Sequence, residues 1–168
     1  SKTSPDGIKS AWNKKSGTNG EINLILINLL KEAGLEVYPL LVSERYNGTV
    51  NRDNPSIDQF NTVYALVVAN NKKYYLDAND KFTPPTIIPV DILNTTALLV
   101  NRKSGGLINI SDDALQYNDV INVSVRVAEN GVVKGNALLS SSDYARVERL
   151  QQYRYDKARY LEQYFQKY

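Results

Sequence analysis

The sequence predicts an α+β protein: helices packed on an antiparallel sheet, followed by a small β unit and a long C-terminal helix. Three observations support this class: a capped, leucine-rich helical segment near the N-terminus, several short β-prone runs joined by turn residues, and a strictly alternating run at 120–127. A Ser-Gly-Gly break at 104–106 separates two expected domains, residues 1–103 and 104–168.

Two helices are expected at the N-terminal end, the first at 5–15 and the second at 19–33. Thr18-Asn19-Gly20-Glu21 fits a capping box, in which the Thr18 hydroxyl accepts the Glu21 backbone N–H and the carboxylate reaches back. Isoleucine and leucine occupy nearly every side of the second helix, which predicts burial on several sides. Gly34 then provides a left-handed C-terminal stop.

Short β-prone runs follow, separated by residues typical of turns and loops. Strands are expected at 35–43, 60–69, 73–76 and 96–101, with a polar loop at 44–56, an Asn70-Asn71 turn and a proline-rich crossing after Asp80. The Asn-Asn pair favours a hairpin, which places Asp77 just after its second strand.

In the second domain, residues 120–127 alternate between apolar and polar side chains, and 129–131 turn the chain into a second strand at 132–139. Ser140-Ser141-Ser142-Asp143 then signals the start of one long helix, 142–168. Its apolar stripe consists of Val147, Leu150, Leu161 and Phe165. Many tyrosines beside Arg and Lys could also indicate base stacking or a membrane surface, but an amphipathic helix covering a sheet explains them more simply.

Composition excludes several kinds of chemistry. The 168 residues contain no Cys, His or Met, so the chain has no thiolate nucleophile, no imidazole base and no Cys/His metal site. Twenty basic residues against eighteen acidic ones give no nucleic-acid footprint, and no run approaches the ~20 apolar residues of a membrane span. We expect no metal, no cofactor, no nucleic-acid partner and no direct membrane insertion.

Four motifs together resemble the transglutaminase-like superfamily of papain-like cysteine hydrolases. They are Gly17-Thr18-Asn19, Leu29-Leu30-Lys31-Glu32-Ala33-Gly34-Leu35, Phe60-Asn61-Thr62 and Tyr75-Leu76-Asp77-Ala78. The resemblance covers about residues 5 to 100. It is strongest to the degenerate segments of large Gram-negative envelope proteins, in which a β-rich domain of unknown function follows.

The resemblance implies where a catalytic triad would lie. The family's Cys, fifteen residues before the Gly of the Ala-Gly pair, corresponds to Asn19, and its His corresponds to Thr62. Asp77 matches the Asp that orients the His ring. A helix N-terminus would stabilise a thiolate at residue 19, but an amide and a threonine hydroxyl cannot replace the nucleophile and the general base.

The resemblance therefore implies a catalytically inactive module of a secreted or periplasmic multidomain protein, of which this chain is expected to be a piece. Asn19, Thr62 and Asp77 are expected to share a cleft that binds a peptide or glycan. The second hypothesis is a purely structural role, as a scaffold beside the parent protein's other domains. The alternative is an active hydrolase, a protease or amidase, with a nucleophile other than cysteine, for which Thr18 is the candidate. The capping role explains Thr18 more simply.

Overall fold

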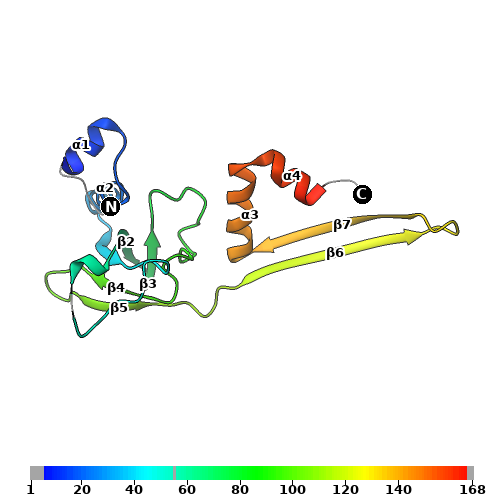
Figure 1. The fold of residues 1–168 in the computed structure, drawn as a ribbon. Helices are drawn as coiled ribbons and strands as arrows, with labels where there is room; N and C mark the ends of the chain where they lie inside the picture. The colour runs from blue at the N-terminus through cyan, green and yellow to red at the C-terminus, as the bar shows by residue number, and fades with distance from the viewer. Residues whose placement is uncertain (1–5, 55, 166–168) are drawn as a thin grey trace. The chain divides into compact units, whose positions relative to one another are not determined.

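The computed structural model describes residues 6–54 and 56–165, the last of these by its backbone alone. The chain divides into two compact units, residues 1–112 and 113–168 (Figure 1). The first unit combines two helices with a curled antiparallel sheet, and the second combines a two-stranded ribbon with two helices. The α+β class predicted from the sequence is confirmed. No helix within 6–54 and 56–165 is long and apolar enough to cross a membrane.

The N-terminal helices are α1 (Gly7–Lys14) and α2 (Asn19–Glu32). The capping box at the start of α2 is formed: the Thr18 N–H donates to the Glu21 carboxylate at 2.8 Å, and the Glu21 N–H donates to the Thr18 hydroxyl at 3.3 Å. Gly34 has a φ of +81°, the left-handed conformation expected after the helix. This prediction from the sequence is therefore confirmed.

Helix α2 is less enclosed than its leucine-rich sequence suggests. Ile27 is buried against the sheet, but Leu29 is 51% exposed. The sheet covers only one side of the helix, and α1 covers part of another. The expectation of burial on several sides is wrong at the C-terminal half of α2. At the N-terminal half, two polar side chains, Glu21 and Asn23, are buried instead.

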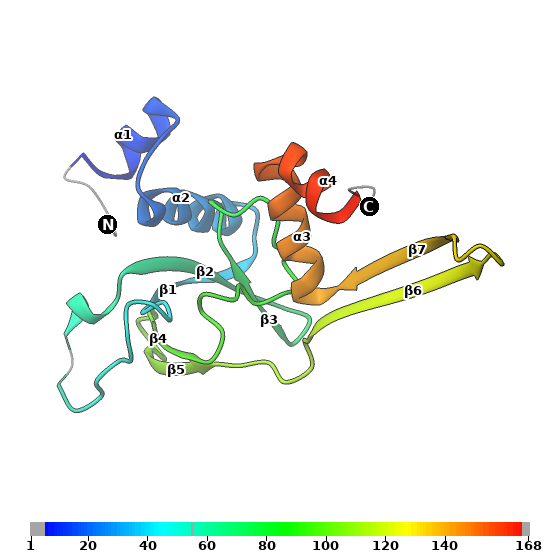
Figure 2. The same cartoon turned by 45° about the vertical axis from the view of Figure 1, so that its right-hand side comes forward.

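The sheet of the first unit contains five antiparallel strands in the order β3-β2-β1-β4-β5, seen edge-on in Figure 2. They are β1 (Glu36–Val42), β2 (Thr62–Ala69), β3 (Lys72–Leu76), β4 (Thr95–Leu99) and β5 (Gly106–Ile110). The predicted turn between β2 and β3 is present, because Asn70 and Asn71 both have positive φ angles of 50° and 60°. A short 3-10 helix, Ile57–Gln59, lies in the polar loop before β2.

Strand β2 is buried on both faces from Thr62 to Val67. Val63, Ala65 and Val67 pack with Ile27 of α2 on one face. Tyr64 and Leu66 point into a second core on the other face, where burial raises the pKa of the Tyr64 hydroxyl. This second core also contains Leu40, Val42, Tyr75, Ile88, Ile92, Ala97 and Ile110.

The first unit extends beyond the boundary expected at residue 103. Strand β5 follows the Ser-Gly-Gly break and pairs with β4, with Leu99 opposite Gly106 and Thr95 opposite Ile110. The glycines make a tight connection rather than a linker, since a Cβ on Gly105 would lie 2.6 Å from the Asn101 carbonyl oxygen. The division therefore falls after Asp112.

The second unit consists of β6 (Tyr117–Val127), β7 (Val133–Ser142), α3 (Asp143–Tyr155) and α4 (Lys157–Phe165). The hairpin agrees with the sequence prediction, but the single helix at 142–168 is wrong. The helix breaks at Asp156, whose φ is −145° and whose carboxylate accepts the Arg159 N–H at 2.9 Å. Asp156 thus caps a new helix. Residues 166–168 lie outside the described residues, as does the Phe165 side chain of the expected apolar stripe.

Arg149 connects the elements of the second unit. Its Nε and Nη2 donate to the Tyr160 hydroxyl at 3.0 and 2.6 Å, which joins α3 to α4. Its Nη1 donates to the Ser141 hydroxyl on β7 at 2.8 Å. The Tyr153 ring meets the Tyr160 ring edge-on at 5.4 Å. The C-terminal tyrosines thus include the contacts that hold α4 against α3.

Thr18→Ala should lower the free energy of unfolding of the first unit by roughly 0.5–2 kcal/mol, because it removes the hydroxyl that caps α2. Urea denaturation followed by the fluorescence of Trp12, the single tryptophan, measures this change. Thr49→Ala, at an exposed loop position, is the control and should leave the midpoint unchanged. Equal midpoints for the two variants would contradict a stabilising cap.

Tyr160→Phe should loosen α4, since it removes the hydroxyl that accepts two hydrogen bonds from Arg149. Hydrogen bonds to charged groups contribute about 1.5–3 kcal/mol, so amide hydrogen exchange in α4 should become about tenfold faster or more. Tyr155→Phe is the matched control, because Tyr155 is 95% exposed. Similar exchange rates in both variants would show that the Arg149 contact does not hold the helix.

Candidate functional site

The three residues singled out from the sequence lie at the ends of neighbouring elements. Asn19 is the first residue of α2, Thr62 is the first residue of β2, and Asp77 directly follows β3. Helix α2 packs on β2, and β2 pairs with β3. The fold therefore brings these three chain positions to the same end of the sheet.

Two of the three side chains touch directly. The Thr62 hydroxyl donates to the Asn19 amide oxygen at 2.5 Å. Asp77 is joined to them through a fourth residue, Asn23, one helical turn after Asn19. The Asn23 amide nitrogen lies 2.8 Å from Asp77 Oδ1 and 3.4 Å from Asn19 Oδ1. We call Asn19, Asn23, Thr62 and Asp77 the polar cluster.

Asn23 is the centre of the polar cluster, and sequence reasoning missed it. Its side chain is fully buried, with both ends of its amide used. The nitrogen also donates to the Val63 carbonyl at 2.7 Å, and the oxygen accepts the Ala78 N–H at 2.8 Å. The signal was an asparagine inside an Ile/Leu-rich helix, four residues from Asn19, because a buried amide requires hydrogen-bond partners.

Two side-chain atoms of the polar cluster, one donor nitrogen and one acceptor oxygen, are unpaired within the part of the chain that the structure describes. Asn19 Nδ2 and Asp77 Oδ2 have no hydrogen-bond partner among the described residues, whereas Asp77 Oδ1 accepts from Asn23 and from both nitrogens of Asn79. Thr62 is buried, but Asn19 and Asp77 are each partly exposed. A ligand that reaches the polar cluster would therefore meet Asn19 and Asp77.

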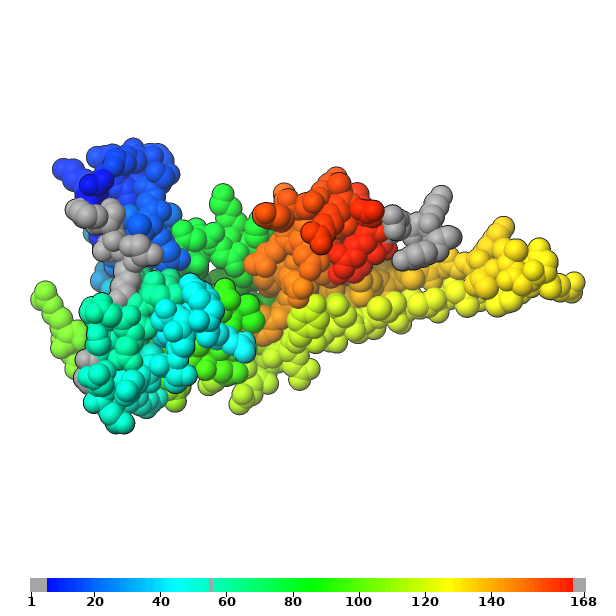
Figure 3. All heavy atoms as spheres, viewed as in Figure 1, coloured from blue at the N-terminus to red at the C-terminus, as the bar shows by residue number. Residues whose placement is uncertain are grey.

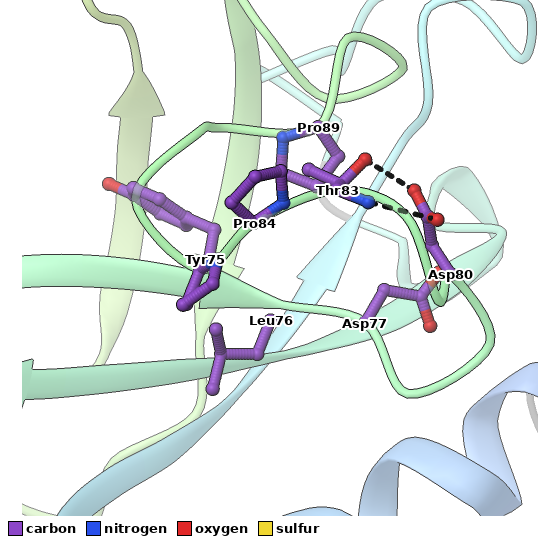
Figure 4. A pocket seen from close by; sticks show the side chains of 8 residues that line it. Tyr75, Leu76, Asp77, Asp80, Thr83, Pro84 and Pro89 are labelled. Carbon is purple, nitrogen blue, oxygen red and sulfur yellow. Dashed lines mark hydrogen bonds between the residues drawn. The ribbon is translucent and has the colours of Figure 1, made fainter. Parts of the chain in front are cut away.

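A small cavity adjoins Asp77 (Figure 4). Its volume is about 100 Å³, below the roughly 300–1,000 Å³ of typical small-molecule pockets, so it can hold only part of a ligand. The Asp80 carboxylate accepts the Phe82 N–H and both the N–H and hydroxyl of Thr83, which fixes one wall. The other lining residues are Tyr75, Leu76, Pro84, Pro85 and Pro89.

The geometry gives the Thr62 hydroxyl no base. It donates to an amide oxygen, which does not accept a proton near neutral pH, and Asp77 bonds to Asn23 instead. A carboxylate does face a hydroxyl at Thr18, whose Oγ1 lies 3.1 Å from Glu21 Oε2. That carboxylate also accepts the Thr18 N–H within the capping box. Across 6–54 and 56–165, no three acidic side chains come close enough to hold a metal ion.

Asn23→Leu should destabilise the first unit, because it leaves the Val63 carbonyl, the Ala78 N–H and Asp77 without their buried partner. Each buried polar group left unpaired costs about 1–3 kcal/mol. Asn28→Leu makes the same change at an exposed position of the same helix and should alter the free energy of unfolding by less than about 0.5 kcal/mol. Urea denaturation of both variants tests this, and equal losses would mean that the Asn23 contacts contribute little.

Comparison of the chain with profiles of known protein families, with curated proteins and with solved structures gives no match. The resemblance to the transglutaminase-like superfamily thus rests on the quoted sequence motifs alone.

Proposed function

We propose that this chain is a catalytically silent module of transglutaminase-like type that binds a peptide or a glycan at the polar cluster. The observation that carries the proposal is the meeting of Asn19, Thr62 and Asp77 around Asn23, at a helix N-terminus and two adjacent strand ends. In the family that the motifs resemble, these are the positions of the Cys, His and Asp. We further propose that the module belongs to a secreted or periplasmic multidomain protein.

The side chains at the polar cluster lack the groups that catalysis in this family requires. A chain without Cys or His cannot form the thiolate and imidazole pair. The Thr62 hydroxyl, at the position that matches the family's imidazole, donates a hydrogen bond to the Asn19 amide oxygen and is itself buried. The polar cluster is therefore suited to holding its own structure and offering hydrogen bonds, but not to transferring a proton.

Two side-chain atoms of the polar cluster without a hydrogen-bond partner among the described residues determine which ligands would fit. Asn19 Nδ2 can donate a hydrogen bond and Asp77 Oδ2 can accept one. A peptide unit offers a carbonyl and an N–H, and a sugar hydroxyl can both accept and donate, so either ligand satisfies both atoms. The proline-lined cavity beside Asp77 could receive a small group attached to such a ligand.

One observation favours the alternative, an active hydrolase with a threonine nucleophile. Thr18 Oγ1 lies 3.1 Å from the Glu21 carboxylate, within reach of a general base. The same carboxylate and hydroxyl form the capping box, which accounts for both residues without catalysis. Hydrolysis of a peptide or amide that is lost in Thr18→Asn, which keeps a capping side chain without the hydroxyl, and in Glu21→Gln, with both variants folded, would establish this alternative and exclude the silent module.

Titration of the isotope-labelled chain with short peptides and oligosaccharides, followed by amide chemical shifts, tests the proposed site. A binding ligand should shift the signals of Asn19, Thr62 and Ala78 in a saturable manner. Asp77→Asn should weaken this binding, because it replaces the spare carboxylate oxygen with an amide group, whereas Asp58→Asn, on the exposed 3-10 helix, should not. Saturable shifts confined to other residues would refute the site, and no shifts with any probe would favour a scaffold.

Asn19→Cys combined with Thr62→His should give a thiol that is much more reactive than that of Asn19→Cys alone. The start of α2 favours a thiolate, and the new imidazole would stand where Thr62 now contacts residue 19. Labelling by iodoacetamide against pH should give a midpoint below the ordinary thiol pKa of about 8.5. Asn28→Cys, exposed on the same helix, is the control. A midpoint near that of the control, with or without the imidazole, would contradict an inherited catalytic position.

A further inference from the structure

The β6–β7 ribbon carries an uncovered apolar face. Residues directly opposite in an antiparallel pair point to the same side, so Ile121, Val123, Val125 and Val127 share a face with their partners on β7. The partners are Leu139, Ala137, Gly135 and Val133. We call these eight residues the apolar ribbon face. The pairs between them on the opposite side include Asn122 with Leu138, Ser124 with Asn136, and Arg126 with Lys134.

Within the second unit, α3 covers only the end of the ribbon nearest to it. Ala145 and Val147 of α3 are buried, and Leu139 is half-buried. Further along, Val123, Val125 and Val127 are 62%, 58% and 65% exposed. Figure 3 shows this outer part of the ribbon, in yellow, reaching beyond the helices of its own unit. Among the described residues of the second unit, nothing covers the outer half of the apolar ribbon face.

This exposure is costly for a structure of two strands. An isolated hairpin is marginally stable in water, and its apolar side chains gain free energy only when another surface removes them from water. Contiguous exposed apolar patches with a polar opposite side mark interaction surfaces. A second layer packed on this side would remove these side chains from water and stabilise the ribbon.

We propose that the second layer is the same face of a second copy of this chain, related by a two-fold axis that passes near Val125. Antiparallel stacking of the two outer halves would place the two α3 helices at opposite ends, where they do not obstruct the contact. The polar sides of both ribbons would then face solvent, and the pair would form a small two-layer sandwich.

Charge and composition favour a copy of this surface over other partners. The apolar ribbon face contains no ionisable residue, so a charged peptide would find no complementary group on it. A membrane surface is disfavoured because residues 118–139 contain no aromatic residue and the turn at the tip carries Glu129. Aliphatic side chains repeating every second residue, in contrast, can interdigitate with an identical row.

The size of the face sets the strength of the association. The five residues of strand in the outer half span about 17 Å, and two strands are about 10 Å wide, which is small beside a standard interface of about 800 Å² per partner. The dimer should therefore form in a concentration-dependent way, with dissociation in roughly the micromolar to millimolar range.

Sedimentation equilibrium of the whole chain, from about 10 µM to about 1 mM, measures this association. The mass should rise from that of the monomer toward twice that value. Val125→Lys should weaken the dimer by about tenfold or more, whereas Ser124→Lys, the neighbouring position on the polar side, should not. A monomer at every concentration, or equal effects of the two lysines, would overturn the proposal. Growth beyond a dimer would also overturn it, in favour of edge-to-edge strand pairing.

Two further measurements test the stacked face, and the second of them uses only the natural chain. A mixture of Val125→Lys and Val125→Glu chains should regain the dimer that each has lost, because residue 125 lies near the two-fold axis and meets its own copy. In a mixture of labelled and unlabelled natural chains, methyl contacts between copies should involve Val123 and Val125. Failure of the lysine and glutamate chains to associate, or absence of methyl contacts between copies at a concentration at which the mass has risen, would refute the stacked face.

Discussion

The buried amide of Asn23 is the interaction on which the first unit depends most directly. An amide removed from water must find partners for its oxygen and its nitrogen, or folding loses several hydrogen bonds at once. Asn23 finds them on three separate pieces of chain: the first turn of its own helix, the start of β2, and the segment that leaves β3. One side chain therefore fixes the rotation of α2 over the sheet.

The candidate site is a consequence of that constraint. Because Asn23 holds α2 against the ends of β2 and β3, Asn19 comes to face Thr62, and Asp77 is held by one of its two oxygens. Asn19 Nδ2 and Asp77 Oδ2 make no hydrogen bond to the described residues, and they are the atoms that we propose bind a ligand. The atoms that stabilise the first unit and the atoms proposed to bind a ligand are therefore different. Asn23 serves the structure alone, whereas Asn19 and Asp77 each use one atom for the structure and offer another to the proposed ligand.

The two units differ in how far their apolar side chains are buried. In the first, β2 has α2 on one face and a second core on the other, so its residues from Thr62 to Val67 are all buried. In the second, polar contacts of Arg149 and a set of tyrosine rings hold the helices together. The valines of the outer ribbon are exposed. Strand propensity favours a ribbon locally, but a second layer is needed to remove its apolar side from water and to stabilise it.

Local signals in the sequence determined the capping box at Thr18, the stop at Gly34, the Asn70-Asn71 turn and the alternation in β6, since each depends on a few adjacent residues. The motif resemblance indicated Asn19, Thr62 and Asp77, of which Asn19 and Thr62 touch directly and Asp77 is joined to them through Asn23. Tertiary structure alone decided which side of α2 is covered, that β5 joins the first sheet, and that the last helix breaks at Asp156 so that Tyr160 can reach Arg149. It also decided the role of Asn23. Burial and long-range hydrogen bonds join residues far apart in the chain, and neither periodicity nor turn propensity contains that information.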